Sequence, residues 1–143
     1  MKDFRNLEVW KRAHETTLAA YRCTRLFPRE ETYGMVSQLR RCSASVAANI
    51  AEGCGRSGNA EFGRFLAMGM GSASELEYFL LLARDLHYLD RETYESLAGE
   101  VEKMRRMLNR LILKVQEENT KATGRNRFGQ MPSAKCQMPT KEH

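Results

Sequence analysis

The stretch LAGEVEKMRRMLNRLILKV, residues 97–115, carries the pattern that decides the fold. Its apolar residues recur at alternating intervals of four and three, the spacing that keeps one side of an α-helix apolar. They are Leu97, Val101, Met104, Leu108, Leu111 and Val115. The pattern predicts a long helix with a coiled-coil-like packing edge, and such an edge needs other helices to cover it.

Three earlier stretches show the same helical spacing, and almost none alternates by two as a strand would. The expected helices cover about 7–26, a start between 28 and 33 through 54, and 59 to about 88. Pro28 should end the first helix and a glycine-rich segment the second, while Asn59 and Asp90 are expected N-caps of the third and fourth. Short connections between long helices predict an all-α, antiparallel up-down-up-down four-helix bundle over residues 1–121.

The last part of the chain has a different composition. After about Lys121 the helical spacing ends, and residues 122–143 hold Gly, Pro, Ser and Lys with few residues that could form a core. We expect a basic tail that is disordered or becomes ordered on a partner.

Length and composition limit the class of protein. A chain of 143 residues suits one domain, and no apolar run approaches the roughly 18 residues that span a bilayer. The first residues lack the apolar segment of a signal peptide, so we expect a cytoplasmic protein without membrane contact. The net charge of +5 is uneven: ten Lys/Arg face six Asp/Glu in residues 1–56, but nine face eleven in residues 57–121. That asymmetry is compatible with a phosphate-binding face or with ordinary solvated surface.

The residue types of enzymatic and metal sites are missing from the sequence. None of His14, His87 and His143 follows a glutamate at the spacing that di-metal bundles use. The four cysteines form no C-x-x-C pair, and there is no P-loop or nucleophile elbow. We therefore expect no metal, no cofactor and no catalytic residue.

A polar stripe follows the second expected helix. It consists of Gln38, Arg41, Ser45, Asn49 and Glu52, spaced three or four residues apart. Ser72 and Glu75 on the third helix are plausible partners. Two interpretations stay open: a structural polar network that fixes helix register or a subunit interface, or a site that faces a ligand or RNA.

The same region resembles a known family. The chain is similar to the four-helix bundle family of large-subunit ribosomal RNA intervening-sequence proteins over about residues 4–115. The matching motifs are Phe4-Arg5-Asn6-Leu7-Glu8-Val9-Trp10, Phe27-Pro28-x-Glu30, Gln38-Leu39-Arg40-Arg41, Ser45, Asn49-Ile50-Ala51-Glu52-Gly53, Arg56, Glu61-Phe62-x-Arg64-Phe65-Leu66 and Gly71-Ser72-x-x-Glu75-Leu76.

The resemblance implies a function without an enzyme activity. Members are encoded within inserts of ribosomal RNA genes and elsewhere, and the related accessory variability proteins of diversity-generating retroelements are pentameric bundles that bind a reverse transcriptase and RNA. The resemblance implies a homo-oligomer of five subunits that binds structured RNA and a reverse transcriptase. The small residues Gly69, Gly71, Ser72 and Ala73 also favour close packing between copies.

The sequence thus predicts a non-enzymatic, homo-oligomeric scaffold that binds RNA or a nucleic-acid enzyme. The expected basic surface consists of Lys11, Arg12, Arg22, Arg25, Arg40, Arg56, Arg125 and Arg127. The alternative is a structural or protein-interaction bundle without affinity for nucleic acid. A small-molecule or metal-binding bundle is disfavoured because the ligand pairs are missing.

Overall fold

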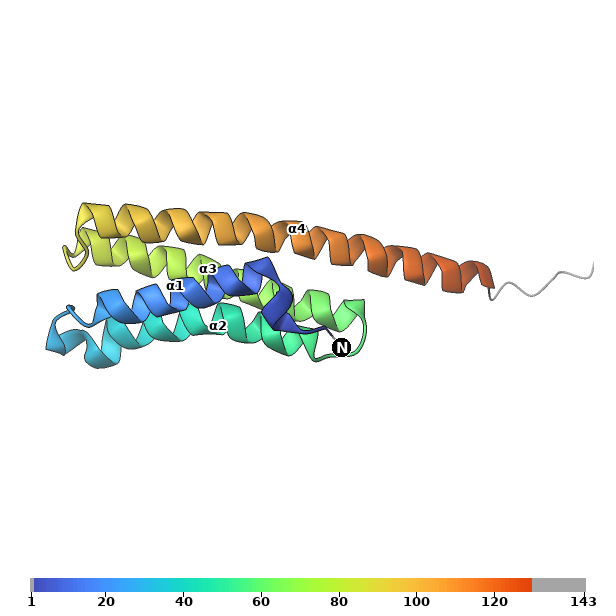
Figure 1. Ribbon diagram of the computed structural model, residues 1–143, viewed down its shortest axis with the longest axis horizontal. Coiled ribbons are helices and arrows are strands. Elements are labelled where there is room, and N and C mark those ends of the chain that lie inside the picture. Colours follow the sequence, from blue (N-terminus) through green and yellow to red (C-terminus); the bar gives the residue numbers. More distant parts are fainter. Residues whose placement is uncertain (1, 130–143) are drawn as a thin grey trace, which may run out of the picture.

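The computed structural model describes residues 2–129, with side chains as far as Arg125. Four α-helices follow one another, and each runs antiparallel to the one before it (Figure 1). They are α1 (Glu8–Thr24), α2 (Ser37–Cys54), α3 (Asn59–Asp85) and α4 (Arg91–Gly129), and the described part of the chain contains no strand. The predicted all-α four-helix bundle is confirmed.

The connection between α1 and α2 consists of two short helical turns. A 3-10 turn at Arg29–Glu31 and a π-helical turn at Thr32–Val36 carry the chain from α1 into α2. The carboxylate of Glu31 accepts a hydrogen bond from the backbone N–H of Met35 at 3.0 Å, which fixes the turn from inside. Two short helical turns therefore occupy the predicted start between Pro28 and Tyr33, but α2 itself begins only at Ser37, because the backbone of Gly34 is not helical.

The second connection depends on glycine. Gly58 has a φ of 83°, in the left-handed region that only glycine adopts without strain, and it occupies the N-cap position of α3. The prediction that Asn59 is the N-cap is wrong, because Asn59 is already the first helical residue and no side chain caps this end.

The third connection follows the prediction more closely. α3 ends at Asp85 rather than near Tyr88, because His87 adopts a φ of 61° and turns the chain. Asp90 then accepts a hydrogen bond from the backbone N–H of Thr93 at 2.7 Å, so its expected role as N-cap of α4 is confirmed.

The core lies along the bundle axis. Leu39 and Ile50 of α2, Leu66 and Leu76 of α3, and Leu108 of α4 are almost completely buried. Five of the six seam residues of α4 are buried, and Leu111 is packed against the core with partial exposure. Burial of a large apolar side chain contributes about 1.5–3 kcal/mol, so this seam holds α4 on the other helices.

α4 is longer than its apolar pattern. The helix continues to Gly129, and the prediction that it ends near Lys121 is wrong. Val115 is its last buried residue as far as Arg125, and α4 runs on past the ends of the other three helices (Figure 1). The hydroxyls of Thr120 and Thr123 bond to the carbonyls of Gln116 and Asn119, so side chains add local bonds here where packing is missing. The remainder of the expected tail, residues 130–143, lies outside the described residues.

No helix within residues 2–129 is long and apolar enough to cross a membrane.

Candidate nucleic-acid interface

The described residues of the expected basic surface are divided among four places. Near the start of α1, the Lys11 ammonium lies 3.0 Å from the Glu8 carboxylate. Beside it, the Arg12 guanidinium lies 3.1 Å from the Glu100 carboxylate of α4. Both cations therefore already have a carboxylate partner.

The last turn of α1 carries a second group, which we call the α1-end cluster: Arg22, Arg25 and Arg40. Arg22 and Arg25 are exposed, and neither forms an ion pair with any described residue. Arg40 comes from α2 and donates hydrogen bonds to the Thr24 hydroxyl at 2.9 Å and the Tyr21 carbonyl at 3.4 Å. Its guanidinium also lies 4.7 Å from the centre of the Tyr21 ring. The fold thus holds Arg40 against the end of α1 and leaves Arg22 and Arg25 exposed at the same end of the helix.

Three positive charges fit this place because the C-terminal end of a helix carries a partial negative charge. The charges of Arg40 and Arg22 also reach the neighbouring thiol of Cys23, where they oppose a larger effect of burial. Burial raises the pKa of Cys23, so this thiol stays protonated at neutral pH.

The remaining predicted cations lie elsewhere. Arg56, in the turn after α2, contacts the Glu52 carboxylate at 2.7 Å and lies 5.0 Å from the centre of the Phe65 ring. Arg125 is exposed near the end of α4, and the side chain of Arg127 lies outside the described residues. The structure therefore does not bring all eight predicted residues onto one surface.

The polar stripe connects α2 to α3. Arg41 donates to the side-chain oxygen of Gln38 at 2.8 Å and forms an ion pair with Glu75. One turn further, the hydroxyls of Ser45 and Ser72 lie 2.9 Å apart. These contacts match the expectation that Ser72 and Glu75 are the partners across the helix pair.

The other end of the stripe differs. The Asn49 amide donates to the Ser45 carbonyl at 2.8 Å and to its hydroxyl at 3.1 Å. Glu52 takes no part, because its carboxylate binds Arg56 instead. Arg41 and Glu52 are exposed in the single chain, and Asn49 is half-buried, so the stripe forms a partly open polar contact along the α2–α3 pair.

The small residues of α3 are divided between two uses. Gly69 and Ala73 are buried, and a β-carbon at residue 69 would lie 3.6 Å from the Val46 carbonyl. The hydroxyl of Ser72 is hydrogen-bonded to the hydroxyl of Ser45 in α2. Only Gly71 faces open space, so most of the expected small patch joins α2 to α3 within one chain.

A family model described as 23S rRNA-intervening sequence protein matches residues 5–110, well over half of the chain. The chain belongs to this family. It is also similar to a crystal structure of a protein of unknown function from the S23 ribosomal protein family of Bacteroides thetaiotaomicron. That comparison has a TM-score of 0.68 and 27% sequence identity, and it covers 73% of this chain and 94% of the other. No curated protein matches the chain. Neither of the two descriptions names a catalytic activity.

In this 23S rRNA-intervening sequence protein, a further group of basic residues was missed by sequence reasoning except for Arg125. We call it the α4 basic row: Arg110, Lys114, Lys121 and Arg125. All four are exposed, and none pairs with a carboxylate in the described part of the chain. The i, i+4 spacing within Arg110–Lys114 and Lys121–Arg125 is the signal that would have identified it. The family match ends at Arg110, so three of the four residues lie beyond it.

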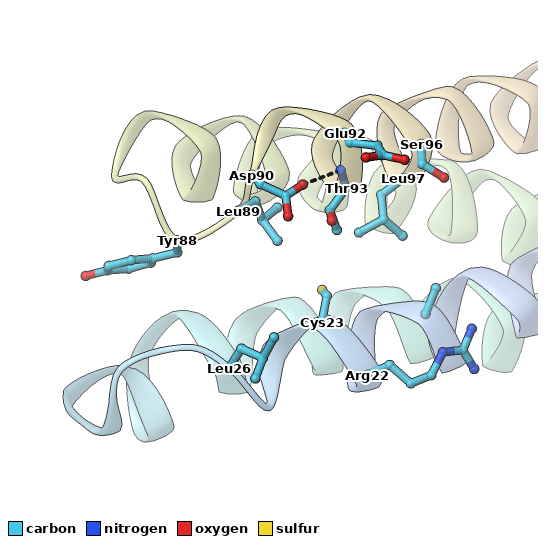
Figure 2. A pocket seen from close by; sticks show the side chains of 11 residues that line it. Arg22, Cys23, Leu26, Tyr88, Leu89, Asp90, Glu92, Thr93, Ser96 and Leu97 are labelled. Atoms are coloured by element: carbon cyan, nitrogen blue, oxygen red, sulfur yellow. Dashed lines mark hydrogen bonds between the residues drawn. The ribbon is translucent and has the colours of Figure 1, made fainter.

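The family member also has an open groove between α1 and the start of α4, with a volume of about 470 Å³. Figure 2 shows Cys23 and Leu26 on one wall and Leu89 and Leu97 on the other. Arg22 of the α1-end cluster, Asp90 and Glu92 add charges to its lining. Asp90 is held by its cap: hydrogen bonds from Thr93 keep its pKa below the ordinary value.

Chemically reactive groups are not assembled here. Burial raises the pKa of Cys42 to about 11, with a further contribution from the charge of Glu75. Burial also raises the pKa of Cys54. Thiols of this kind are poor nucleophiles at neutral pH because little thiolate is present. Among the described residues, no three His, Cys, Asp or Glu side chains are placed to hold a metal ion.

Proposed function

We propose that this protein is a non-enzymatic, self-associating helical scaffold that binds structured RNA. The observation that carries the proposal is the α1-end cluster, in which Arg22 and Arg25 extend from the surface without a carboxylate partner among the described residues. The family description, which names an intervening sequence of 23S rRNA, supports RNA as the class of nucleic acid.

The absence of an ion pair at Arg22 and Arg25 matters energetically. A phosphate that binds Lys11 or Arg12 competes with Glu8 or Glu100 for the same cation. A phosphate that binds Arg22 or Arg25 displaces only mobile counterions, and their release is the main source of electrostatic affinity for nucleic acids. The planar guanidinium also suits two parallel hydrogen bonds to a phosphate.

Self-association is the second part of the proposal. The outward side of α3 exposes Met68 and Tyr78, and Gly71 lies between them with open space in front of it. Two exposed large apolar side chains near a glycine favour the close approach of a second copy. The family resemblance implies five copies, and in such a ring each α1-end cluster would be repeated, so that phosphate contacts add across subunits.

The test is binding of a fluorescently labelled RNA hairpin to the full chain at about 50 mM and about 200 mM salt. We expect binding that weakens steeply as salt rises, and a loss of at least about tenfold in the double variant Arg22→Glu and Arg25→Glu. The matched control is Arg91→Glu with Arg106→Glu, which makes the same change in net charge at arginines paired with Glu95 and Glu102.

The same assay distinguishes the alternative. A reverse transcriptase, the protein partner that the resemblance implies, is added in a parallel titration. If the unmodified chain binds neither the hairpin nor the reverse transcriptase, the protein is an interaction bundle without affinity for nucleic acid. Equal loss in the control and in the cluster variant would show that net charge, rather than this cluster, determines binding.

A further inference from the structure

The α4 basic row has a regular geometry. Arg110 and Lys114 lie one turn apart, and so do Lys121 and Arg125, with about 6 Å between neighbours within each pair. Because α4 is one continuous helix, the row extends about 22 Å from first to last residue at 1.5 Å per residue. Glu117 and Glu118 lie between the two pairs, so the row consists of two separate pairs of positive charges along one helix.

The row differs from the other cations of α4 in its partners. Arg91, Lys103 and Arg106 each bind a glutamate within one turn of the same helix. Arg105 binds Glu77 of α3. The four residues of the row have no such partner within the described chain, so their charges remain available to an external anion.

The second pair of the row, Lys121 and Arg125, also lies where the bundle leaves α4 open. After Val115 no described side chain of α4 is buried, and beyond Asn119, which still lies beside the start of α3, the described part of the helix has no apolar face. A helix without an apolar face gains little stability from packing against the rest of its own chain. α4 extends here beyond the ends of the other three helices, so a bulky partner can approach it without meeting α1 or α2 (Figure 1).

Composition favours one form of nucleic acid. Single strands are held mainly by stacking of their bases on aromatic side chains, whereas duplex RNA is recognised through its shape and its phosphates. Between Tyr94 and Phe128, α4 contains no aromatic residue. The row can therefore bind the phosphates of an RNA backbone, but it has no aromatic side chains on which unpaired bases could stack.

We infer that the α4 basic row is a second RNA contact and that it binds the phosphate backbone of a double-stranded segment. This inference rests on the proposed function, since RNA is the partner proposed there, but it assigns a different surface and a defined form of RNA. The α1-end cluster lies at the other end of the bundle, so the two contacts would hold one structured RNA at separate points.

The test compares two alanine variants of the full chain. The row variant carries Arg110→Ala, Lys114→Ala, Lys121→Ala and Arg125→Ala. The control variant carries Arg64→Ala, Arg91→Ala, Lys103→Ala and Arg106→Ala, which removes four cations that are already paired. Alanine favours helix, and circular dichroism checks that both variants keep their helix content. The probes are a labelled RNA duplex of about 20 base pairs, one of its single strands, and poly-glutamate.

We expect the row variant to lose at least tenfold in affinity for the duplex and the control less than threefold. The magnitude of the slope of log affinity against log salt should fall by about 3.6 in the row variant, because four phosphate contacts are lost. A row variant that binds the duplex as tightly as the unmodified chain would overturn the inference and leave the proposed function intact. Equal affinity for the single strand, or for poly-glutamate, would overturn the choice of duplex RNA. Failure of the unmodified chain to bind any RNA would overturn both proposals.

Discussion

Gly53 of α2 packs so closely against Phe62 of α3 that a β-carbon at residue 53 would lie 3.0 Å from the phenyl ring. The same β-carbon would also lie 3.0 Å from the β-carbon of Phe65. The two helices therefore meet at the turn only because residue 53 has no side chain, which gives a physical reason for glycine at the end of the Asn49–Gly53 motif.

The first prediction concerns this contact. Gly53→Ala should lower the free energy of unfolding by about 1–3 kcal/mol, because both phenylalanines are buried and have little room to move. Urea titration followed by circular dichroism measures the change. Gly99→Ala is the matched control: it lies within α4 with open space around it, and it should raise stability by up to about 1 kcal/mol. A neutral result at residue 53 would mean that α2 and α3 can separate at the turn without cost.

The second prediction concerns the polar stripe. Asn49→Leu removes two hydrogen bonds to Ser45, and we expect a loss of about 1 kcal/mol in urea titration. Arg41→Gln removes an ion pair whose two side chains are about half exposed, and it should cost less than about 1 kcal/mol. If the larger loss came from Arg41, the stripe would be covered in solution by another subunit.

The third prediction is a pH dependence. Hydrogen bonds from Thr93 lower the pKa of Asp90 below its ordinary 3.8 in the folded protein. A carboxyl group with a depressed folded pKa stabilises the fold above its unfolded pKa, and this contribution is lost as the pH falls through the folded value. Stability measured between pH 6 and 2 should therefore drop below about pH 4 partly through Asp90.

Two variants separate the cap from the charge. Asp90→Asn keeps an oxygen that accepts from Thr93 and should retain most of the stability at pH 7, with a weaker fall at low pH. Asp90→Ala should lose stability at pH 7 as well. Identical pH profiles for the unmodified chain and Asp90→Asn would show that Asp90 does not contribute to the acid transition.

The fourth prediction concerns the thiols. With a pKa of about 11 against an ordinary 9.0, Cys42 holds about 100-fold less thiolate at a given pH than an exposed cysteine. Iodoacetamide at pH 8 should leave Cys42 unmodified for long after a free cysteine has reacted, as mass spectrometry of its peptide would show. In about 6 M guanidinium chloride the difference should vanish. Fast labelling in the native protein would mean that α2 opens readily.

The fifth prediction concerns self-association. Met68→Glu together with Tyr78→Glu should reduce the sedimentation coefficient to that of a monomer, because two charges would have to be buried at the α3 surface. Leu113→Glu changes an equally exposed apolar residue on α4 and should leave the assembly intact. An unmodified chain that sediments as a monomer at micromolar concentration would exclude the homo-oligomer.

The bundle was predictable because apolar spacing reports directly on burial. The seam of α4 and the cap at Asp90 follow from residues within a few positions of one another, and the structure confirms both. The end of α4 was not predictable in this way. Residues after Lys121 have no apolar face, and local backbone bonds continue a helix that packing does not require.

The candidate site was harder to predict than the fold for an electrostatic reason. A sequence shows which residues are charged but not which charges are already paired. Arg12 looks like Arg22 in the sequence, yet only Arg12 has a carboxylate from α4 within reach. The contact between Arg41 and Glu75 could be predicted from residue spacing, because the two residues lie on facing helices. The ion pair between Glu52 and Arg56 at the end of α2 was not predicted, and it keeps Glu52 out of the polar stripe.

The extra length of α4 also changes what its charges experience. Arg125 lies about 15 Å along the helix from Val115, where the packed bundle ends. At physiological ionic strength, an electrostatic field in solution decays over about 8 Å. The carboxylates of the packed bundle are therefore largely screened at that distance, whereas Glu117 and Glu118 of the same helix lie close to the far pair. By projecting beyond its neighbours, the helix places Lys121 and Arg125 in an electrostatic environment set by nearby residues of α4 rather than by the rest of the bundle.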